Sequence, residues 1–347
     1  MRVAFLLPSL QNKGPCLVVR TLVEELVARG LDVVVFYFDG GNEIFFPCPV
    51  KQISFWNRPN FAKFDVFHSH GIRPDSYVLR FKRHLGVVCL STIHSYWGRD
   101  LVFTYGALRG WIMIALWNVL LLRHDQIVVL SKDMQKYYRR FLLNRKIGFI
   151  YNSKIVSEDA FPEMSVAESV LLSNFSKKYT VLGAIAQVSK LKGFSQVLKI
   201  LPDNPDLGFL LVGDGSELQK LKTEAEALSV ASQCLFIGSK PEAYKWLKMV
   251  DIYVMTSYTE GFPLVLLEAA FMRCPVVCSN LPVFRELFPE EVSYFELDRG
   301  DSLVRAIRHC QRNAMNYSLS IYKRAHDNFS VQLLGERHEH LYHRLLT

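Results

Sequence analysis

Short apolar runs alternate with longer segments of helical spacing in the first half of the chain. Residues 3–7 are apolar without interruption, residues 17–28 carry apolar side chains at helical spacing, and residues 31–38 are apolar again, with Gly30 as a C-cap signal before them. This order predicts a βαβ unit. Further strands are expected at residues 66–68, 87–93 and 126–130. The alternation predicts a parallel, doubly wound sheet.

The second half of the chain repeats this pattern. Apolar runs separated by helical segments predict strands at residues 180–185, 208–212, 234–237, 252–255 and 275–279. A second doubly wound sheet follows. A polar stretch at residues 152–161 predicts a hinge, and a closing helix is expected at residues 331–346. Because 347 residues exceed the usual size of one hydrophobic core, we expect two domains, at residues 1–155 and 156–330.

Composition narrows the class of protein. Half of the residues are hydrophobic, which excludes a disordered chain. The apolar run at residues 3–7 ends at Pro8 and is too short for a signal peptide. Seven scattered cysteines without an export signal favour reduced, mostly buried thiols. These features predict a cytoplasmic protein.

Positive charge is concentrated in the first half. Residues 1–160 carry 21 Lys and Arg against 12 Asp and Glu, whereas residues 161–347 carry 20 against 21. An apolar stretch with two tryptophans, at residues 111–122, precedes the densest group of cations: Lys132, Lys136, Arg139, Arg140, Arg145 and Lys146. This pattern predicts peripheral contact with an anionic membrane; a core helix followed by a solvated helix explains it equally well. A membrane span is not expected, because Arg109 and Asn118 interrupt a short segment. Nucleic acid is not an expected partner, since no recognition module occurs.

The loop after residues 252–255 carries the most informative chemistry. Ligands of open α/β sheets collect beyond the carboxyl ends of strands, and two facing sheets form a cleft. Gly261 permits an unusual turn and Pro263 suits the first helical position, so a helix is expected from about residue 263, with its free N–H groups facing the cleft. Glu268 leans back toward the helix start, so that it and Glu260 flank an anion site. Such carboxylates are useful beside a nucleotide diphosphate if they bind sugar hydroxyls. The alternative is a surface helix whose glutamates favour its positive end.

The two glutamates and seven intervening residues, within the sequence EGFPLVLLEA at residues 260–269, resemble the signature of retaining GT-B glycosyltransferases of glycosyltransferase family 4 (glycosyl transferases group 1). Further segments resemble the family's glycine turn, base-proximal strand end, phosphate-binding lysine and interdomain crossover: residues 210–217, 236–238, 192–193 and 329–330. The resemblance covers the second half almost throughout and the first half more loosely. It implies two Rossmann-like domains facing a cleft, the first on the acceptor side and the second binding the donor, with the helix at residues 331–347 packing back on the first.

The resemblance also implies roles for single residues. Glu268 would bind the ribose hydroxyls, Glu260 the hydroxyls of the transferred sugar, and Lys192 the diphosphate. His94, at the end of an apolar strand, resembles a family histidine that faces the transferred sugar, although a histidine there also fits a hydrogen bond in the core. Glu260, His94 and Lys192 are therefore the catalytic candidates. The remaining candidates for the donor site are Gly261, Phe262, Pro263 and Leu264, whose amides would hold the diphosphate, with Gln187, Gly213, Gly215, Ile237 and Gly14.

Several positions depart from the family pattern. Gln187 stands where the family has an arginine, so that either Lys192 suffices or Lys190 compensates. Arg273 stands where a glycine is common, and Gly14-Pro15 replaces a pair of glycines.

We expect no metal and no cofactor. The sequence has no Asp-x-Asp motif, and an ammonium with a helix end can stabilise the leaving group. His68 and His70 share one face of a strand but lack a third ligand. Burial explains Cys274 and Cys278 better than zinc or a disulfide. The histidines of the closing helix, which are His338, His340 and His343, are expected to be solvated.

The expected function is transfer of a hexose or N-acetylhexosamine from a nucleotide sugar, with a UDP-sugar favoured, to a glycan or lipid-linked acceptor in bacterial surface polysaccharide synthesis. By resemblance, the leaving phosphate would help to deprotonate the acceptor. A catalytically silent GT-B partner subunit stays open because of Gln187. An inverting transferase or a nucleotide-sugar epimerase is disfavoured by the intact spacing of the glutamates. A dinucleotide oxidoreductase is less favoured still, because no Gly-x-Gly-x-x-Gly follows the first strand.

Overall fold

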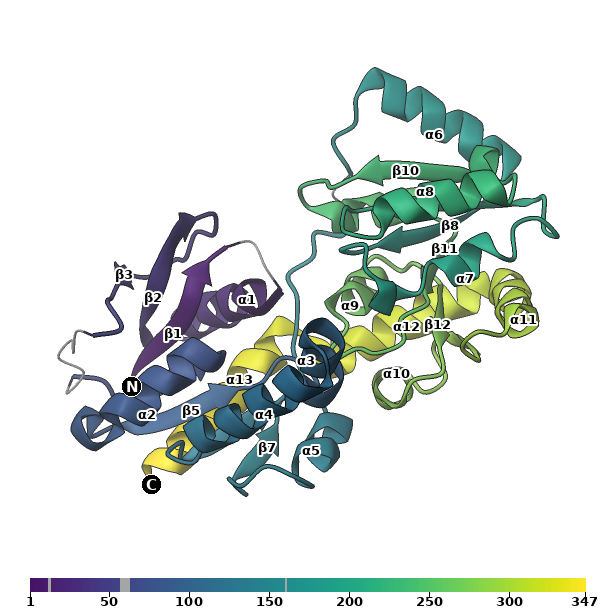
Figure 1. Cartoon of the computed structure of the whole chain (residues 1–347). Helices are drawn as coiled ribbons and strands as arrows, with labels where there is room; N and C mark the ends of the chain where they lie inside the picture. Colours follow the sequence, from purple (N-terminus) through teal and green to yellow (C-terminus); the bar gives the residue numbers. More distant parts are fainter. Residues whose placement is uncertain (12–13, 57–62, 160) are drawn as a thin grey trace. The chain divides into compact units, whose positions relative to one another are not determined.

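The computed structural model describes residues 1–11, 14–56, 63–159 and 161–347, and it divides the chain into two compact units. The first unit comprises residues 1–155 and 329–347, and the second comprises residues 156–328. The boundary falls in the polar stretch at residues 152–161, of which residue 160 lies outside the described residues. Each unit is a parallel sheet with helices, which confirms the expected fold class of two Rossmann-like domains (Figure 1). The cleft between them stays a prediction.

The first unit contains a seven-stranded parallel sheet in the order β3-β2-β1-β4-β5-β6-β7. Its strands are β1 (Arg2–Leu10), β2 (Asp32–Asn42), β3 (Val50–Gln52), β4 (Val66–His70), β5 (Val88–Thr92), β6 (Gln126–Val129) and β7 (Ile147–Phe149). Its helices are α1 (Gly14–Ala28), α2 (Ile72–Leu85), α3 (Trp97–Tyr105), α4 (Ala107–Leu121), α5 (Lys132–Tyr138) and α13 (Val331–Leu346). The edge strands β3 and β7 were not expected.

Helix α13 belongs to the first unit although it closes the chain. It packs on α1, where Gly335 allows close contact: an added Cβ would lie 2.3 Å from the Cγ of Glu25. An ion pair of 2.7 Å joins Arg29, just after α1, to Glu339 of α13. Leu334, Leu341 and Tyr342 of α13 lie in the same core as β1. The last helix therefore completes the core of the first sheet.

The second unit contains a six-stranded parallel sheet in the order β10-β9-β8-β11-β12-β13. Its strands are β8 (Thr180–Ile185), β9 (Leu207–Val212), β10 (Cys234–Gly238), β11 (Ile252–Met255), β12 (Val276–Ser279) and β13 (Ser293–Phe295). Its α-helices are α6 (Val166–Lys178), α7 (Ser195–Leu198), α8 (Leu218–Ala227), α9 (Leu264–Phe271), α10 (Pro282–Leu287), α11 (Gly300–Arg312) and α12 (Ala314–Phe329). Short 3-10 helices are η1 (Lys190–Lys192), η2 (Ala231–Gln233) and η3 (Ala243–Met249).

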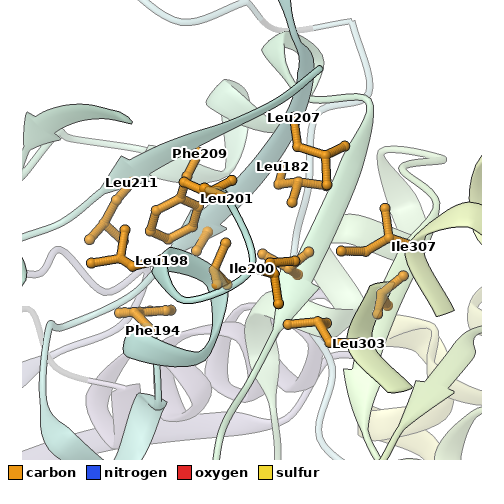
Figure 2. Packing of buried hydrophobic residues seen from close by; sticks show 14 of the residues in the cluster. Leu182, Phe194, Leu198, Ile200, Leu201, Leu207, Phe209, Leu211, Leu303 and Ile307 are labelled. Carbon is orange, nitrogen blue, oxygen red and sulfur yellow. The ribbon is translucent and has the colours of Figure 1, made fainter. Parts of the chain in front are cut away.

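The core of the second unit fixes the segment that follows β8. Phe194 and Leu198 pack with Phe209 and Leu211 of β9, and Leu303 of α11 belongs to the same cluster (Figure 2). Phe194 comes two residues after Lys192 and is 5% exposed. Burying these side chains removes apolar surface from water, so the end of η1 is held against the sheet.

The expectation that His338 is solvated is wrong. Its side chain is 4% exposed, its ring lies 5.8 Å from that of His68, and its Nδ1 donates to the carbonyl of Leu334 at 2.9 Å. The reason is that α13 turns this face toward β4. His340 and His343 are exposed, as expected. Burial lowers the pKa of His338 to about 4.

This burial predicts a pH dependence of stability. Between pH 6.5, the ordinary pKa, and about 4, His338 is protonated in the unfolded chain but not in the folded one. The unfolded state then binds more protons, so the free energy of unfolding falls as the pH falls. We expect His338 to contribute a loss of about 2 kcal/mol from pH 7 to pH 5.

Urea unfolding at both pH values measures this loss. His338→Gln should reduce the difference between the two pH values, whereas His343→Gln, on the exposed side of the same helix, should leave it as in the wild type. An unchanged pH dependence in His338→Gln would contradict the assignment.

Candidate functional site

The loop between β11 and α9 differs in detail from the expectation. Helix α9 begins at Leu264, one residue later than expected, and Pro263 is its N-cap residue with φ −82°. Since proline has no N–H, Gly261, Phe262 and Leu264 are the members of the expected group with amides to donate. The unusual turn expected at Gly261 stays a prediction.

Glu260 and Lys192 form an ion pair. The Nζ of Lys192 lies 2.6 Å from Oε1 of Glu260, which also accepts a 2.6 Å hydrogen bond from the hydroxyl of Ser257. The two side chains are 26% and 11% exposed, respectively. Charge-assisted hydrogen bonds are stronger than neutral ones, and partial burial reduces screening by water. Each of the two candidate residues therefore fixes the position of the other.

Two hydrogen bonds join the loops that carry this ion pair. The side-chain hydroxyl of Thr256 donates to the carbonyl of Lys192 at 2.7 Å, and the backbone amide of Tyr258 donates to the carbonyl of Leu191 at 2.8 Å. Gly193 has φ +63°, and an added Cβ would lie 2.4 Å from the carbonyl oxygen of Thr256. This position therefore requires glycine for both its backbone angle and its close contact.

Glu268 is buried in α9, where it is the fifth residue. Burial raises the pKa of Tyr253 in β11 well above its usual range. The negative charge of Glu268 adds to this rise, and that of Glu260 adds less. Both carboxylates therefore lie near this tyrosine, whose hydroxyl donates to the carbonyl of Ile185 at 3.3 Å. Sequence reasoning missed Tyr253, because a tyrosine within a short apolar strand is also an ordinary core residue.

The other candidates of the second unit lie at the carboxyl ends of adjacent strands. An added Cβ at Gly213 would lie 1.9 Å from the carbonyl oxygen of Ala186, so the turn after β9 packs against the segment after β8. The amide of Gly213 donates at 2.8 Å to the carbonyl of Gly238, at the end of β10. These turns bring Gly215, Ile237 and the exposed Gln187 to the same edge of the sheet as the β11–α9 loop.

His94 and Gly14 belong to the first unit, so their position relative to Lys192 and Glu260 stays a prediction. Nε2 of His94 lies 2.9 Å from Nδ1 of His70. Burial lowers the pKa of His94 to about 4, so this imidazole is neutral at pH 7. Gly14 is the first residue of α1.

The paired histidines of β4 take part in hydrogen bonds. Nδ1 of His68 lies 2.8 Å from the hydroxyl of Tyr342, and its Nε2 lies 2.7 Å from that of Thr92. Within the part of the chain that the structure describes, no group of three His, Cys, Asp or Glu residues is arranged to hold a metal ion. That the reaction needs no metal stays a prediction.

A cavity of about 350 Å³ in the second unit adjoins the ion-paired loops. Lys190, Lys220, Glu217 and Tyr258 line it, together with Gly193. Lys190, the cation expected to compensate for Gln187, thus lies on the wall of a cavity beside the site. Its ammonium can meet an anion there.

The departure at Arg273 has a structural explanation. Its φ is +56°, a left-handed conformation that glycine adopts without strain. The guanidinium lies 4.1 Å from the centre of the Tyr322 ring, and its Nη2 is 3.6 Å from Glu158. A cation–π contact offsets part of the backbone strain. The glycine that is common at this position in the family therefore fits the left-handed backbone conformation found here.

Comparisons with known proteins agree with this arrangement. The family model described as "Glycosyl transferases group 1" matches residues 172–326, and that described as "Glycosyltransferase Family 4" matches residues 17–153. The chain is 28% identical to the O-antigen biosynthesis glycosyltransferase WclY of Escherichia coli, over 99% of both chains.

Two solved structures share the fold over nearly the whole chain. Sucrose-phosphate synthase of Thermosynechococcus elongatus has a TM-score of 0.81 at 18% identity and covers 99% of this chain and 98% of its own. HepE of Anabaena, in complex with UDP and glucose, has a TM-score of 0.80 at 16% identity and covers 99% of this chain and 100% of its own. The chain belongs to the GT-B glycosyltransferases, with a family-4 type first half and a group-1 second half.

Gly193→Ala is expected to destabilise the second unit more than Gly238→Ala. Both glycines have positive φ, of 63° and 79°, but an added Cβ meets nothing within 4 Å at Gly238. We expect a loss of about 1 kcal/mol from backbone strain at Gly238. At Gly193 the clash with Thr256 should raise the loss to about 2–4 kcal/mol.

Urea unfolding of the two variants beside the wild type gives these losses. Equal losses would mean that the close contact between the loops does not hold η1 in place.

Proposed function

We propose that the chain transfers a hexose or N-acetylhexosamine from a UDP-sugar to a glycan or lipid-linked acceptor, with retention of anomeric configuration and without a metal. The observation that carries this proposal is the ion pair of Lys192 and Glu260 beside the start of α9, with Glu268 buried one turn further on. This combination offers a cation for phosphate and carboxylates for hydroxyls.

The geometry supports a separate role for each of these groups in binding the donor. The leaving nucleotide diphosphate gains negative charge as the glycosidic bond breaks, and fixed donors stabilise that charge without reorganising. Lys192 and the amides of Gly261, Phe262 and Leu264 supply such donors. Glu260 holds the ammonium of Lys192 in place and accepts hydrogen bonds from hydroxyls of the transferred sugar. Glu268 accepts hydrogen bonds from the ribose hydroxyls. Following the family resemblance, the leaving phosphate takes the acceptor's proton on the same face.

The comparisons support the donor and the process. The similar HepE structure contains UDP and glucose, and the similar WclY protein is named for O-antigen biosynthesis. We therefore propose a role in bacterial surface polysaccharide synthesis, such as that of lipopolysaccharide, O-antigen or capsule. The protein would act at the cytoplasmic face of the inner membrane, where lipid-linked acceptors present their sugars.

Glu268→Ala is expected to weaken UDP binding. The substitution removes charge-assisted hydrogen bonds of about 1.5–3 kcal/mol each, which corresponds to roughly 10- to 100-fold in Kd. Removing a negative charge near the diphosphate would by itself strengthen UDP binding. A higher Kd in the variant therefore reports the loss of hydrogen bonds to the ribose hydroxyls. Titration calorimetry with UDP measures the change.

Glu290→Ala removes an exposed glutamate of the same unit and serves as the charge-matched control. Thermal unfolding of both variants shows that each is folded. Unchanged UDP affinity in a folded Glu268→Ala variant would reject the role of this residue in ribose binding.

Transfer itself is tested with purified full-length protein, a panel of nucleotide sugars and a polyprenyl-diphosphate sugar acceptor. Activity should persist in EDTA, and proton NMR of the product should give the anomeric configuration of the donor. Activity that EDTA abolishes and Mg²⁺ or Mn²⁺ restores would contradict the metal-free mechanism, and an inverted product would contradict retention. A protein that no nucleotide sugar stabilises thermally, and that transfers none, would instead be a silent partner subunit.

A further inference from the structure

A cavity of about 680 Å³ lies in the first unit between α13 and the edge strand β7, and it is here called the α13 cavity. Its volume falls within the range of roughly 300–1,000 Å³ that is usual for ligand sites. The residues that line it come from β6, β7, the segment after β7, α5 and α13: Val128, Lys132, Gly148, Phe149, Ile150, Tyr151, Arg337, His340, Leu341 and Arg344. All of them belong to the first unit, whereas Lys192, Glu260 and Glu268 belong to the second.

The wall that the sheet contributes to the α13 cavity is apolar. Gly148 of β7 pairs with Val128 of β6, and paired residues of neighbouring parallel strands face the same side of a sheet. Val128 lies in the same core as Leu341 of α13, so this is the side that α13 covers. Because Gly148 has no side chain, the space above it stays open, and the buried Ile150 continues the apolar wall.

Helix α13 separates its charges between two sides. Arg337, His340 and Arg344 recur at intervals of three or four residues, which places them on one side of the helix, toward the cavity. Glu339 lies on the other side, where its Oε2 is 2.7 Å from the Nε of Arg29. Like the other helices of the described residues, α13 is not long and apolar enough to cross a membrane. The cavity therefore receives the cations of this helix and not its paired carboxylate.

Lys132 of α5 adds a positive charge from another wall. Its Nζ lies 5.7 Å from the centre of the Phe149 ring, and the guanidinium carbon of Arg337 lies 5.7 Å from the centre of the Tyr151 ring. Among the described residues that line the cavity, none is Asp or Glu. Such a lining attracts an anion, and the planar guanidinium of arginine can hold two phosphate oxygens at once.

The neutral groups of the lining select among anions. Sugar hydroxyls need carboxylates or amides as partners, and the lining side chains supply neither, so an acidic glycan would leave polar groups unpaired. Inorganic phosphate would leave the apolar wall of Val128 and Ile150 in contact with water. The charges of Lys132, Arg337 and Arg344 match the several negative charges of a diphosphate better than the single charge of a carboxylate.

We propose that the α13 cavity binds an organic diphosphate, in which a diphosphate group is joined to an apolar or aromatic body. The phosphates would lie between Lys132, Arg337 and Arg344, and the body would cover the wall at Val128 and Gly148. A prenyl diphosphate and a nucleoside diphosphate share this chemistry. The site goes beyond the proposed transfer, since none of its residues belongs to the proposed donor site.

Titration calorimetry of the full chain tests the site with farnesyl diphosphate, adenosine diphosphate and inorganic pyrophosphate. At least one organic diphosphate should bind more tightly than pyrophosphate, and the one that binds identifies the source of the ligand. Arg337→Gln with Arg344→Gln should weaken this binding at least about tenfold, because charge-assisted hydrogen bonds to phosphate are lost. Gly148→Val should also weaken it, since the new side chain fills the cavity without changing its charge; its Cβ would lie 3.0 Å from the side-chain amide of Gln126, which is able to shift.

A matched control removes the same charge from exposed positions of the first unit outside the lining. Arg139→Gln with Arg140→Gln should bind the organic diphosphate like the wild type. Thermal unfolding shows that each variant is folded. The proposal is overturned if neither organic diphosphate binds, if pyrophosphate binds as tightly, or if the control loses as much affinity as the double variant of α13. Unchanged binding in either folded cavity variant would overturn it as well.

Lys192→Ala separates this site from the proposed donor site. This variant should weaken UDP binding and keep the binding of the organic diphosphate, whereas the double variant of α13 should keep the UDP binding that Lys192 supports. A protein that binds an organic diphosphate through Arg337 and Arg344, but no UDP through Lys192, would support the α13 cavity and count against the donor site. The opposite result would overturn the α13 cavity alone.

Discussion

The ion pair of 2.6 Å between Lys192 and Glu260 is the contact on which the candidate site depends. Its partners come from different loops, so their meeting requires the loops to stay in register. The bond from Thr256 to the carbonyl of Lys192 and the missing side chain of Gly193 provide that register. A partly buried charge without its partner would lose solvation without compensation. The chain therefore encodes the cation, the carboxylate and the close contact of their loops as one unit.

Much of the fold follows from the sequence, because uninterrupted apolar runs bounded by polar residues define buried strands. β8, β11 and α13 have the expected bounds. The three-residue edge strands are different, since a run as short as Ser293–Phe295 has no measurable periodicity. The burial of His338 could not be predicted either, because the strand that covers it lies some 270 residues earlier in the chain.

The candidate site divides along the same line. The spacing of Glu260 and Glu268 is local to one loop and one helix, so the sequence indicates it directly. The contact of Lys192 with Glu260 spans 68 residues, and only the packing of two strand ends creates it. Arg273 is an intermediate case: the sequence marks it as a departure from glycine, and its φ of +56° gives the reason. Patterns within one helix or strand can be predicted from the sequence, whereas contacts between elements are known only from the folded structure.

The two units differ in net charge, and this difference matches two kinds of anionic partner: a single diphosphate and a phosphate-rich surface. The first unit has 23 Lys and Arg against 12 Asp and Glu, a net charge of +11, whereas the second has 18 against 21, a net charge of −3. Because salt screens exposed charges beyond roughly 8–10 Å, a net charge of −3 does not prevent a local cation and a helix end from holding one diphosphate. A bilayer presents many phosphates over a wide area, and dispersed surface cations suit it. The second unit would thus recognise a small ligand by geometry, and contact of the first unit with an anionic membrane through its summed charge stays a prediction.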